Sequence, residues 1–301
     1  MSSSPEQNTD EHFTYHPKFD SEEGDITLRS LEGTLYRVPS FVLRTTCGFF
    51  ESMFALLSKS SSNPGNNPNT NSSPIPTSQP DKTLSVLLLM ISGLEIPMWT
   101  SFDDVCSLLQ LCESWEAPGP ISIIRSSITS PLFLSDPLKL YATATHFGWE
   151  EEAKLASTHT LKLNLHDEQY EETLSSLGVG ALMRLLRLHR SRRDKMKEML
   201  DDITLFNAGN SGNPTTGDMP SCAGCGMGID HHEWREFKSR IFWEMDRCAA
   251  AEVIGSVEME DWPETVNCWA AKCKGCGKFY YDKVITVKKL RECIIRLPTT
   301  V

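Results

Sequence analysis

The sequence lacks a long apolar run and has no surplus of positive charge. Its longest apolar run, residues 86–91, is far shorter than the ~20 residues of a membrane-spanning helix. Residues 1–17 are polar and lack the apolar core of a secretory signal. Acidic residues outnumber basic ones by 40 to 29, and the net charge of −11 argues against a chain that coats DNA or anionic membrane. We therefore expect an intracellular protein, cytoplasmic or nuclear, that is neither secreted nor transmembrane.

Signatures of several enzyme classes are also missing. The chain has neither the G-x-S-x-G of α/β-hydrolases nor the G-x-x-x-x-G-K-[ST] that binds phosphates. His232-Glu233 could begin the H-E-x-x-H motif of a metalloprotease, but Glu236 stands where the second His is required. We predict that the protein is not an enzyme, has no catalytic residues and takes no small-molecule substrate.

Two stretches of low complexity divide the chain, whose 301 residues are enough for about two domains. Ser58–Pro80 is mainly Ser, Asn and Pro, which cannot bury enough apolar surface to offset the entropy lost on ordering. Asn207–Pro220 is the second stretch and the best candidate for a linker. The predicted parts are a disordered N-terminus (1–19), a first domain (20–135) with a flexible insertion (58–81), a helical extension (136–206), the linker (207–220) and a Cys-rich module (221–301).

Residues 24–57 have the pattern of a hairpin followed by helices. Ile26 and Leu28 alternate with polar residues, a turn follows at 31–34, and 35–38 form the returning strand. Pro39-Ser40 then opens a helix. Apolar residues at helical spacing predict further helices at 84–92, 103–114, 121–128, 137–147, 149–162, 167–176 and 179–202.

This order of short signatures resembles the BTB/POZ family. The resemblance rests on Asp25-Ile26 opening the first strand, Gly33 in the hairpin, the second strand running into Pro39-Ser40, and Phe49-Phe50 before Met53-Phe54. PGPISIIR (118–125) and HFGWEEEAKLAS (146–157) are similar to stretches in BTB-containing proteins of basidiomycete fungi. The family usually has His where Pro39 stands, and its loop after the second helix is shorter.

The resemblance covers roughly residues 24–200 and implies an α+β domain that binds other proteins, including a second copy of itself, without catalysis. It also implies an alternative role as a substrate adaptor of a cullin-type ubiquitin ligase. A second alternative comes from the chain itself: Arg184–Leu200 carries seven Lys or Arg by Lys197, as in a nuclear-localisation or nucleic-acid-binding patch. The same run is also typical of a solvated helix face, so a nucleic-acid-binding regulator remains the less favoured hypothesis.

The C-terminal part contains the motif C-x-G-C-G twice, at Cys222–Gly226 and Cys273–Gly277. Each C-x-x-C turn can place two thiolates on one edge of a metal ion, and four thiolates are a common ligand set of structural Zn²⁺. The sequence therefore predicts one structural zinc ion bound by Cys222, Cys225, Cys273 and Cys276. Four reduced cysteines packed in a core, or a redox pair, are the alternatives.

Several further residues of this module remain open as reserve ligands. They are His231, His232, Cys248 and Cys268. A helix is predicted at 233–253, and the residues after Cys276 alternate as in a strand of a zinc-ribbon-like hairpin, with Cys293 in a second apolar strand. Cys47, Cys106 and Cys112 stand alone among apolar residues and are expected to be buried.

Overall fold

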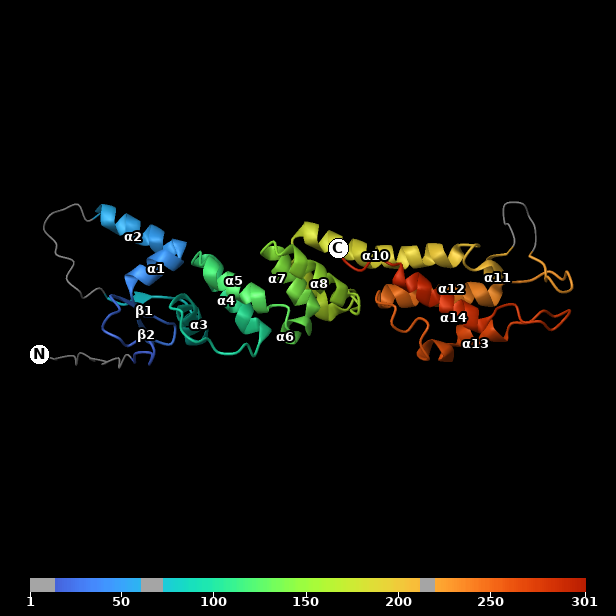
Figure 1. Cartoon of the computed structure of the whole chain (residues 1–301), viewed down its shortest axis with the longest axis horizontal. Helices are drawn as coiled ribbons and strands as arrows, with labels where there is room; N and C mark the ends of the chain where they lie inside the picture. Colours follow the sequence, from blue (N-terminus) through green and yellow to red (C-terminus); the bar gives the residue numbers. More distant parts are fainter. Residues whose placement is uncertain (1–13, 61–72, 212–219) are drawn as a thin grey trace, which may run out of the picture. The chain divides into compact units, whose positions relative to one another are not determined.

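The structure is a computed structural model that describes residues 14–60, 73–211 and 220–301 (Figure 1). It separates into two compact units, Met1–Phe133 and Leu134–Val301. The described residues are mostly helical and include one three-stranded sheet in the first unit. The predicted α+β class is therefore confirmed.

The sheet of the first unit is built on the predicted hairpin. Strand β1 (Ile26–Arg29) pairs antiparallel with β2 (Leu35–Val38), and Gly33 supplies the positive φ of 95° in the turn between them. The third strand, β3 (Ile75–Pro76), pairs parallel with β1 and gives the order β2-β1-β3.

Strand β3 lies inside the predicted flexible insertion at 58–81 and corrects it in part. The backbone NH of Thr77 donates to the carbonyl of Arg29 at 2.8 Å, and that of Leu31 donates to the carbonyl of Gln79 at 2.9 Å. These bonds depend on the backbone alone, which is why a stretch of Ser, Asn and Pro can still supply a short edge strand. Residues 61–72 of the insertion lie outside the described residues.

Residues 14–19 also differ from the sequence prediction, which placed them in a disordered N-terminus. The NH of Leu35 donates to the carbonyl of Thr14, and the NH of His16 donates to the carbonyl of Leu35, both at 2.9 Å. The His16 ring stacks on Tyr36, and Phe19 is buried. The aromatic side chains therefore hold this segment against β2, whereas residues 1–13 lie outside the described part of the chain.

The first unit is completed by helices that agree with the predicted positions. Leu84, Leu87 and Leu88 are buried on one face, as their spacing predicted, and the Ser101 side chain caps its helix by accepting from the NH of Asp103 at 3.2 Å. Cys47 and Cys112 are buried, and Cys106 is half-buried. The helices are α1 (Ser40–Thr46), α2 (Gly48–Ser60), α3 (Asp81–Ile91), α4 (Phe102–Ser114), α5 (Pro118–Ser127) and α6 (Pro131–Leu134).

The second unit is helical in all its regular structure among the described residues. The three predicted helices up to residue 176 and the long helix that follows are all present. Its elements are α7 (Pro137–His146), α8 (Glu150–Thr160), the 3-10 helix η1 (Glu168–Tyr170), α9 (Glu171–Ser176), α10 (Val179–Asp201), α11 (Asn207–Asn210), α12 (His232–Arg247), the 3-10 helix η2 (Glu258–Asp261), α13 (Pro263–Ala270) and α14 (Lys283–Ile295).

One buried cluster joins the end of α10 to α12, α13 and α14. Met196 and Leu200 of α10 pack with Trp234 and Phe237 of α12 and with Leu290 of α14. Burial of this apolar surface is the main force that holds the four helices together. The sequence assigned α10 to an extension and the others to a Cys-rich module, but in the structure they share one core.

Two local predictions in this unit were wrong. The alternating stretch after Cys276, predicted as strand, becomes helix α14, and Cys293 is buried on that helix rather than in a strand. The Asp282 side chain accepts from the NH of Ile285 at 2.9 Å and caps the helix, while Thr286, Leu290 and Cys293 form its buried face. The helix predicted at 233–253 ends at Arg247, because Cys248 takes an extended conformation (φ −139°, ψ 97°), and Ala251, with a φ of 62°, could not continue a right-handed helix.

Replacing Gly209 should destabilise the second unit. Gly209 lies in α11, where a Cβ would overlap the indole of Trp234, whose Nε1 donates to the side chain of the neighbouring Asn210 at 3.0 Å. We expect Gly209→Ala to lower the free energy of unfolding by about 1–3 kcal/mol, as other overpacked sites do. Urea unfolding followed by tryptophan fluorescence measures the change.

Gly180→Ala is the matched control, because Gly180 lies in α10 with open space around its Cβ position. This variant should be as stable as the wild type or slightly more stable. Equal stability of the Gly209→Ala variant would contradict the close packing of α11 on Trp234.

Candidate metal centre

The two C-x-G-C-G motifs fold into two turns with the same hydrogen bonds. In the first turn, the NH of Cys222 donates to the carbonyl of Met227, and the NH of Gly226 donates back to the carbonyl of Cys222, both at 2.8 Å. In the second turn, the NH of Cys273 donates to the carbonyl of Lys278, and the NH of Gly277 donates to the carbonyl of Cys273, again both at 2.8 Å. An antiparallel bridge closes each turn, at Ser221 and Gly228 and at Lys272 and Phe279. The sequence repeat is therefore a structural repeat.

The last glycine of each motif is required by the backbone. Gly226 has a φ of 73° and Gly277 a φ of 72°. An L-residue pays a steric penalty in this left-handed region, whereas glycine does not. Each glycine lets its chain turn back so that both sulfurs of the motif face the same side.

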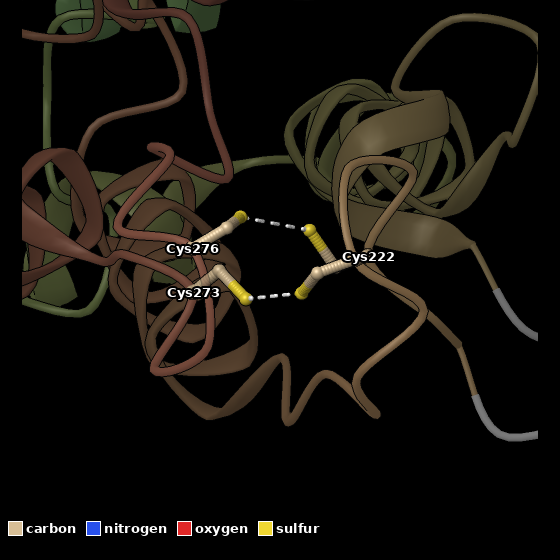
Figure 2. Close-up of side chains that lie close together, drawn as sticks. Cys222, Cys273 and Cys276 are labelled. Atoms are coloured by element: carbon tan, nitrogen blue, oxygen red, sulfur yellow. Dashed lines mark hydrogen bonds between the residues drawn. The ribbon is translucent and has the colours of Figure 1, made fainter.

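The two turns face each other and bring all four sulfurs together, with Cys222 on one turn and Cys273 and Cys276 on the other (Figure 2). The Sγ atoms of Cys222 and Cys276 are 3.6 Å apart, and those of Cys225 and Cys273 are 3.4 Å apart. All four Sγ atoms lie within 4.8 Å of one another. The four predicted ligands thus form one cluster that is compatible with a metal site.

The cluster also has the electrostatics of a cation site. Backbone hydrogen bonds at Cys276 and Gly275 lower the pKa of the Cys273 thiol to about 6, which favours its thiolate form. At Cys225 a backbone hydrogen bond at Met227 favours the thiolate, but the Cys273 sulfur opposes a second charge and the pKa of Cys225 rises to about 11. A bound cation removes that repulsion, because each thiolate then faces positive charge.

Hydrogen-bonded side chains below the cluster link the two turns to the core. His231 follows the first turn and Tyr281 the second, and the His231 Nδ1 and the Tyr281 hydroxyl are 2.8 Å apart. The other ring nitrogen of His231 is 3.0 Å from the Ser211 hydroxyl, and the Tyr281 ring stacks on Trp234. Burial lowers the pKa of His231, which favours the neutral ring. Sequence spacing gave no sign of this pair, since the two residues are fifty positions apart.

The four reserve ligands lie outside the cluster. His231 is engaged with Tyr281 and Ser211, and His232 is exposed at the start of α12. Cys268 is buried in the helical core. The Cys248 sulfur is 3.8 Å from the carbonyl of Leu161. Over residues 14–60, 73–211 and 220–301, only the four predicted cysteines form a group that could hold a metal ion.

Several bases of the predicted basic helix, now α10, are engaged within the second unit. Arg192 is buried, and its guanidinium donates to the carbonyls of Ala249 at 2.7 Å and Pro298 at 2.6 Å. Arg193 forms an ion pair with Asp246 at 2.6 Å. These two arginines connect α10 to other parts of the unit, so the charge of the run is partly structural.

Comparison with known proteins adds no relative: no family model and no curated protein matches the chain. The resemblance to the BTB/POZ family therefore stays a prediction. In the part of the chain that the structure describes, no helix is both long and apolar enough to cross a membrane.

Replacing Gly277 should weaken metal binding without removing a ligand. Gly277→Ala forces a Cβ into the left-handed region, at a cost of about 1–2 kcal/mol. We expect metal affinity to fall about 5- to 30-fold. Titration of the apoprotein with Co²⁺, followed by the thiolate-to-cobalt absorption, measures it.

Gly228→Ala serves as the control, because this residue follows the first turn, has no positive φ and has open space at its Cβ position. Its affinity for Co²⁺ should match that of the wild type. An equal effect of both substitutions would argue against a specific backbone requirement at Gly277.

Proposed function

We propose that this chain is a non-enzymatic adaptor for protein–protein interaction. Its first unit is a BTB/POZ-like docking domain, and its second unit is stabilised by one structural zinc ion. The observation that carries the proposal is the exposure of large apolar side chains on α1 and α2 of the first unit.

Large apolar side chains are exposed on these two helices. Phe41 of α1 is 64% exposed, and Phe49 and Leu56 of α2 are 47% and 68% exposed. Leu43 and Phe50, on the same helices, are buried in the unit. Large apolar surface on a folded unit is typical of a protein-binding site, since water contact with it is unfavourable.

The position of α1 is fixed by the residues that carry the family resemblance. The Asp25 carboxylate accepts from the NH of Ser40 at 2.5 Å and from its hydroxyl at 2.6 Å. Partial burial opposes ionisation of Asp25, but the hydrogen bonds from Ser40 outweigh it and lower the pKa of this carboxyl. A carboxylate at the start of a helix also interacts favourably with the helix dipole. The start of β1 thus orients the helix that presents Phe41, which supports a docking role for the hairpin and α1.

Zinc is the ion that best fits the four sulfurs. Thiolates are preferred ligands of Zn²⁺, and four sulfurs at about 2.3 Å from a tetrahedral ion lie about 3.8 Å apart. The measured Sγ–Sγ distances of 3.4 and 3.6 Å are close to that edge. Four protein ligands leave no position for a catalytic water, so we assign the ion a structural role. No specific observation favours the two alternatives, a nucleic-acid-binding regulator or a cullin adaptor.

Protein purified without chelator should contain about one zinc ion per chain. The double substitution Cys273→Ser/Cys276→Ser should lose this zinc and become sensitive to protease in the second unit, because two of four ligands are removed. Elemental analysis and limited proteolysis measure both effects. Cys248→Ser is the control and should keep its zinc. Well-folded wild type without zinc would overturn the assignment.

The first partner to test is a second copy of the chain. If α1 and α2 mediate self-association, wild type should form dimers as concentration rises from about 1 to 100 μM, within the usual range for weak interfaces. Phe41→Glu places a charge in the apolar surface and should weaken the dimer at least about tenfold, a change of 1.4 kcal/mol or more. Sedimentation velocity measures the association.

Leu31→Glu is the matched control, since Leu31 is equally exposed in the hairpin turn. A wild type that stays monomeric excludes self-association through this surface. A photo-crosslinking residue at position 41 then tests for another partner, with position 22, exposed before β1, as the control. Equal crosslinking at both positions would contradict a docking role of α1.

A further inference from the structure

A groove between α10 and α12 of the second unit combines an apolar floor with a basic rim. Its volume is about 430 Å³. Phe242 and Trp243 of α12 provide the apolar surface, and the buried Leu200 of α10 also lines the groove. The polar residues that line it are Lys197, Asp201, Arg235, Lys238 and Ser239.

Charge in the groove is unbalanced, with three cations and one carboxylate among the lining residues. Asp201 forms an ion pair with Lys238 at 2.6 Å. Arg235 pairs at 2.8 Å with Asp230, which does not line the groove. Lys197 is exposed and lies over the Phe242 ring at 5.7 Å. Lys238 and Arg235 are thus already paired with carboxylates, and the positive charge that the groove offers to an acidic ligand lies at Lys197.

Trp243 provides an apolar anchor point in this groove. Its side chain is 64% exposed, although Ile241 and Met245 on the same helix are buried. Tryptophan is among the residues that contribute most to protein interfaces, because its ring buries a large area with few rotatable bonds. From Arg235 to Trp243 the lining part of α12 covers about 12 Å of helix axis, enough for a short segment of chain.

We propose that this groove binds a short acidic segment of a partner protein that carries at least one bulky apolar side chain. An acidic residue would face Lys197, and the apolar side chain would pack on the exposed Trp243. This inference goes beyond the proposed function, because it concerns the second unit and holds whether or not the first unit self-associates.

The same groove is a poorer match for single-stranded nucleic acid. Successive bases need a series of accessible ring faces on which to stack. The Phe242 ring lies at 79° to the Trp243 ring, and Arg193 and Lys197 lie over Phe242 at 4.9 and 5.7 Å. The lining thus offers one exposed ring, which suits one apolar anchor of a peptide better than a row of bases.

The test uses the full chain and a fluorescein-labelled peptide of about twelve residues, in which Asp and Glu flank one Phe and one Leu. One matched peptide has Ser in place of Phe and Leu, and a second has Lys in place of Asp and Glu. A labelled 20-nucleotide oligo-dT is the nucleic-acid probe. Fluorescence anisotropy measures binding to wild type, Trp243→Ala, Lys197→Glu and the control Lys288→Glu, which reverses an exposed charge on α14 outside the groove.

We expect the acidic-apolar peptide to bind wild type at least tenfold more tightly than either matched peptide or oligo-dT. Trp243→Ala and Lys197→Glu should each weaken binding at least tenfold, and Lys288→Glu less than twofold. Both groove residues are exposed, so thermal unfolding should confirm that the variants are folded. Absence of binding, equal binding to all variants, or preference for oligo-dT would each overturn the proposal.

Discussion

The association of the two Cys turns is the constraint on which the second unit depends. It joins Cys222 to Cys276 and Cys225 to Cys273, and so closes a loop that contains α12 and α13. Closing so long a loop costs chain entropy, which must be offset by contacts made when the ends meet. Hydrogen-bonded thiols alone are weak, because sulfur is a poor donor and a poor acceptor. Metal–thiolate bonds are strong enough to supply this stabilisation, since the free energy of binding the ion becomes free energy of folding.

The two Cys turns and the helical core are connected through one buried pair. His231 and Tyr281 each follow a different turn, and their contact at 2.8 Å lies where the cluster ends and the core begins. Tyr281 stacks on Trp234, and Trp234 in turn packs against Phe206 and Phe237. The two turns are therefore packed against the core of the unit and do not form a separate module. Their geometry and the packing of α12 on α10 are parts of one structure.

The parts of this structure that could be predicted from the sequence are those with a local cause. The four Cys ligands come from a motif that specifies its own turn, through the spacing of two sulfurs and a glycine with positive φ. Helices with a clear apolar face, such as α3 and α10, follow from periodicity for the same reason. Helix α14 was mistaken for a strand because Phe279, Tyr281, Val284 and Val287 suggested alternation, whereas the capping residue Asp282 and the buried face favour a helix.

Features that arise between distant segments could not be predicted. Strand β3 exists because the backbone of residues 75–77 finds an open edge on β1, and its own sequence carries no strand pattern. The His231–Tyr281 pair forms only when the segments after the two Cys turns meet. The groove forms only when α10 packs beside α12. The run of basic residues in α10 is another feature whose environment the sequence could not predict. Its composition alone suggested a single basic patch, whereas Arg192 is buried and Lys197 remains exposed beside an aromatic floor.

Helix α12 connects the first Cys turn, the buried core and the groove. It begins at His232, six positions after Gly226, so the helix follows directly on the first Cys turn. One face of α12 carries Trp234, Phe237 and Ile241 into the core, and Arg235, Lys238 and Trp243 line the groove on another. A helix held along one face by the core and linked at its start to Tyr281 through His231 loses little entropy when a ligand binds its other face. A metal ion held by the four sulfurs would therefore help to keep the proposed groove in one conformation without touching its ligand.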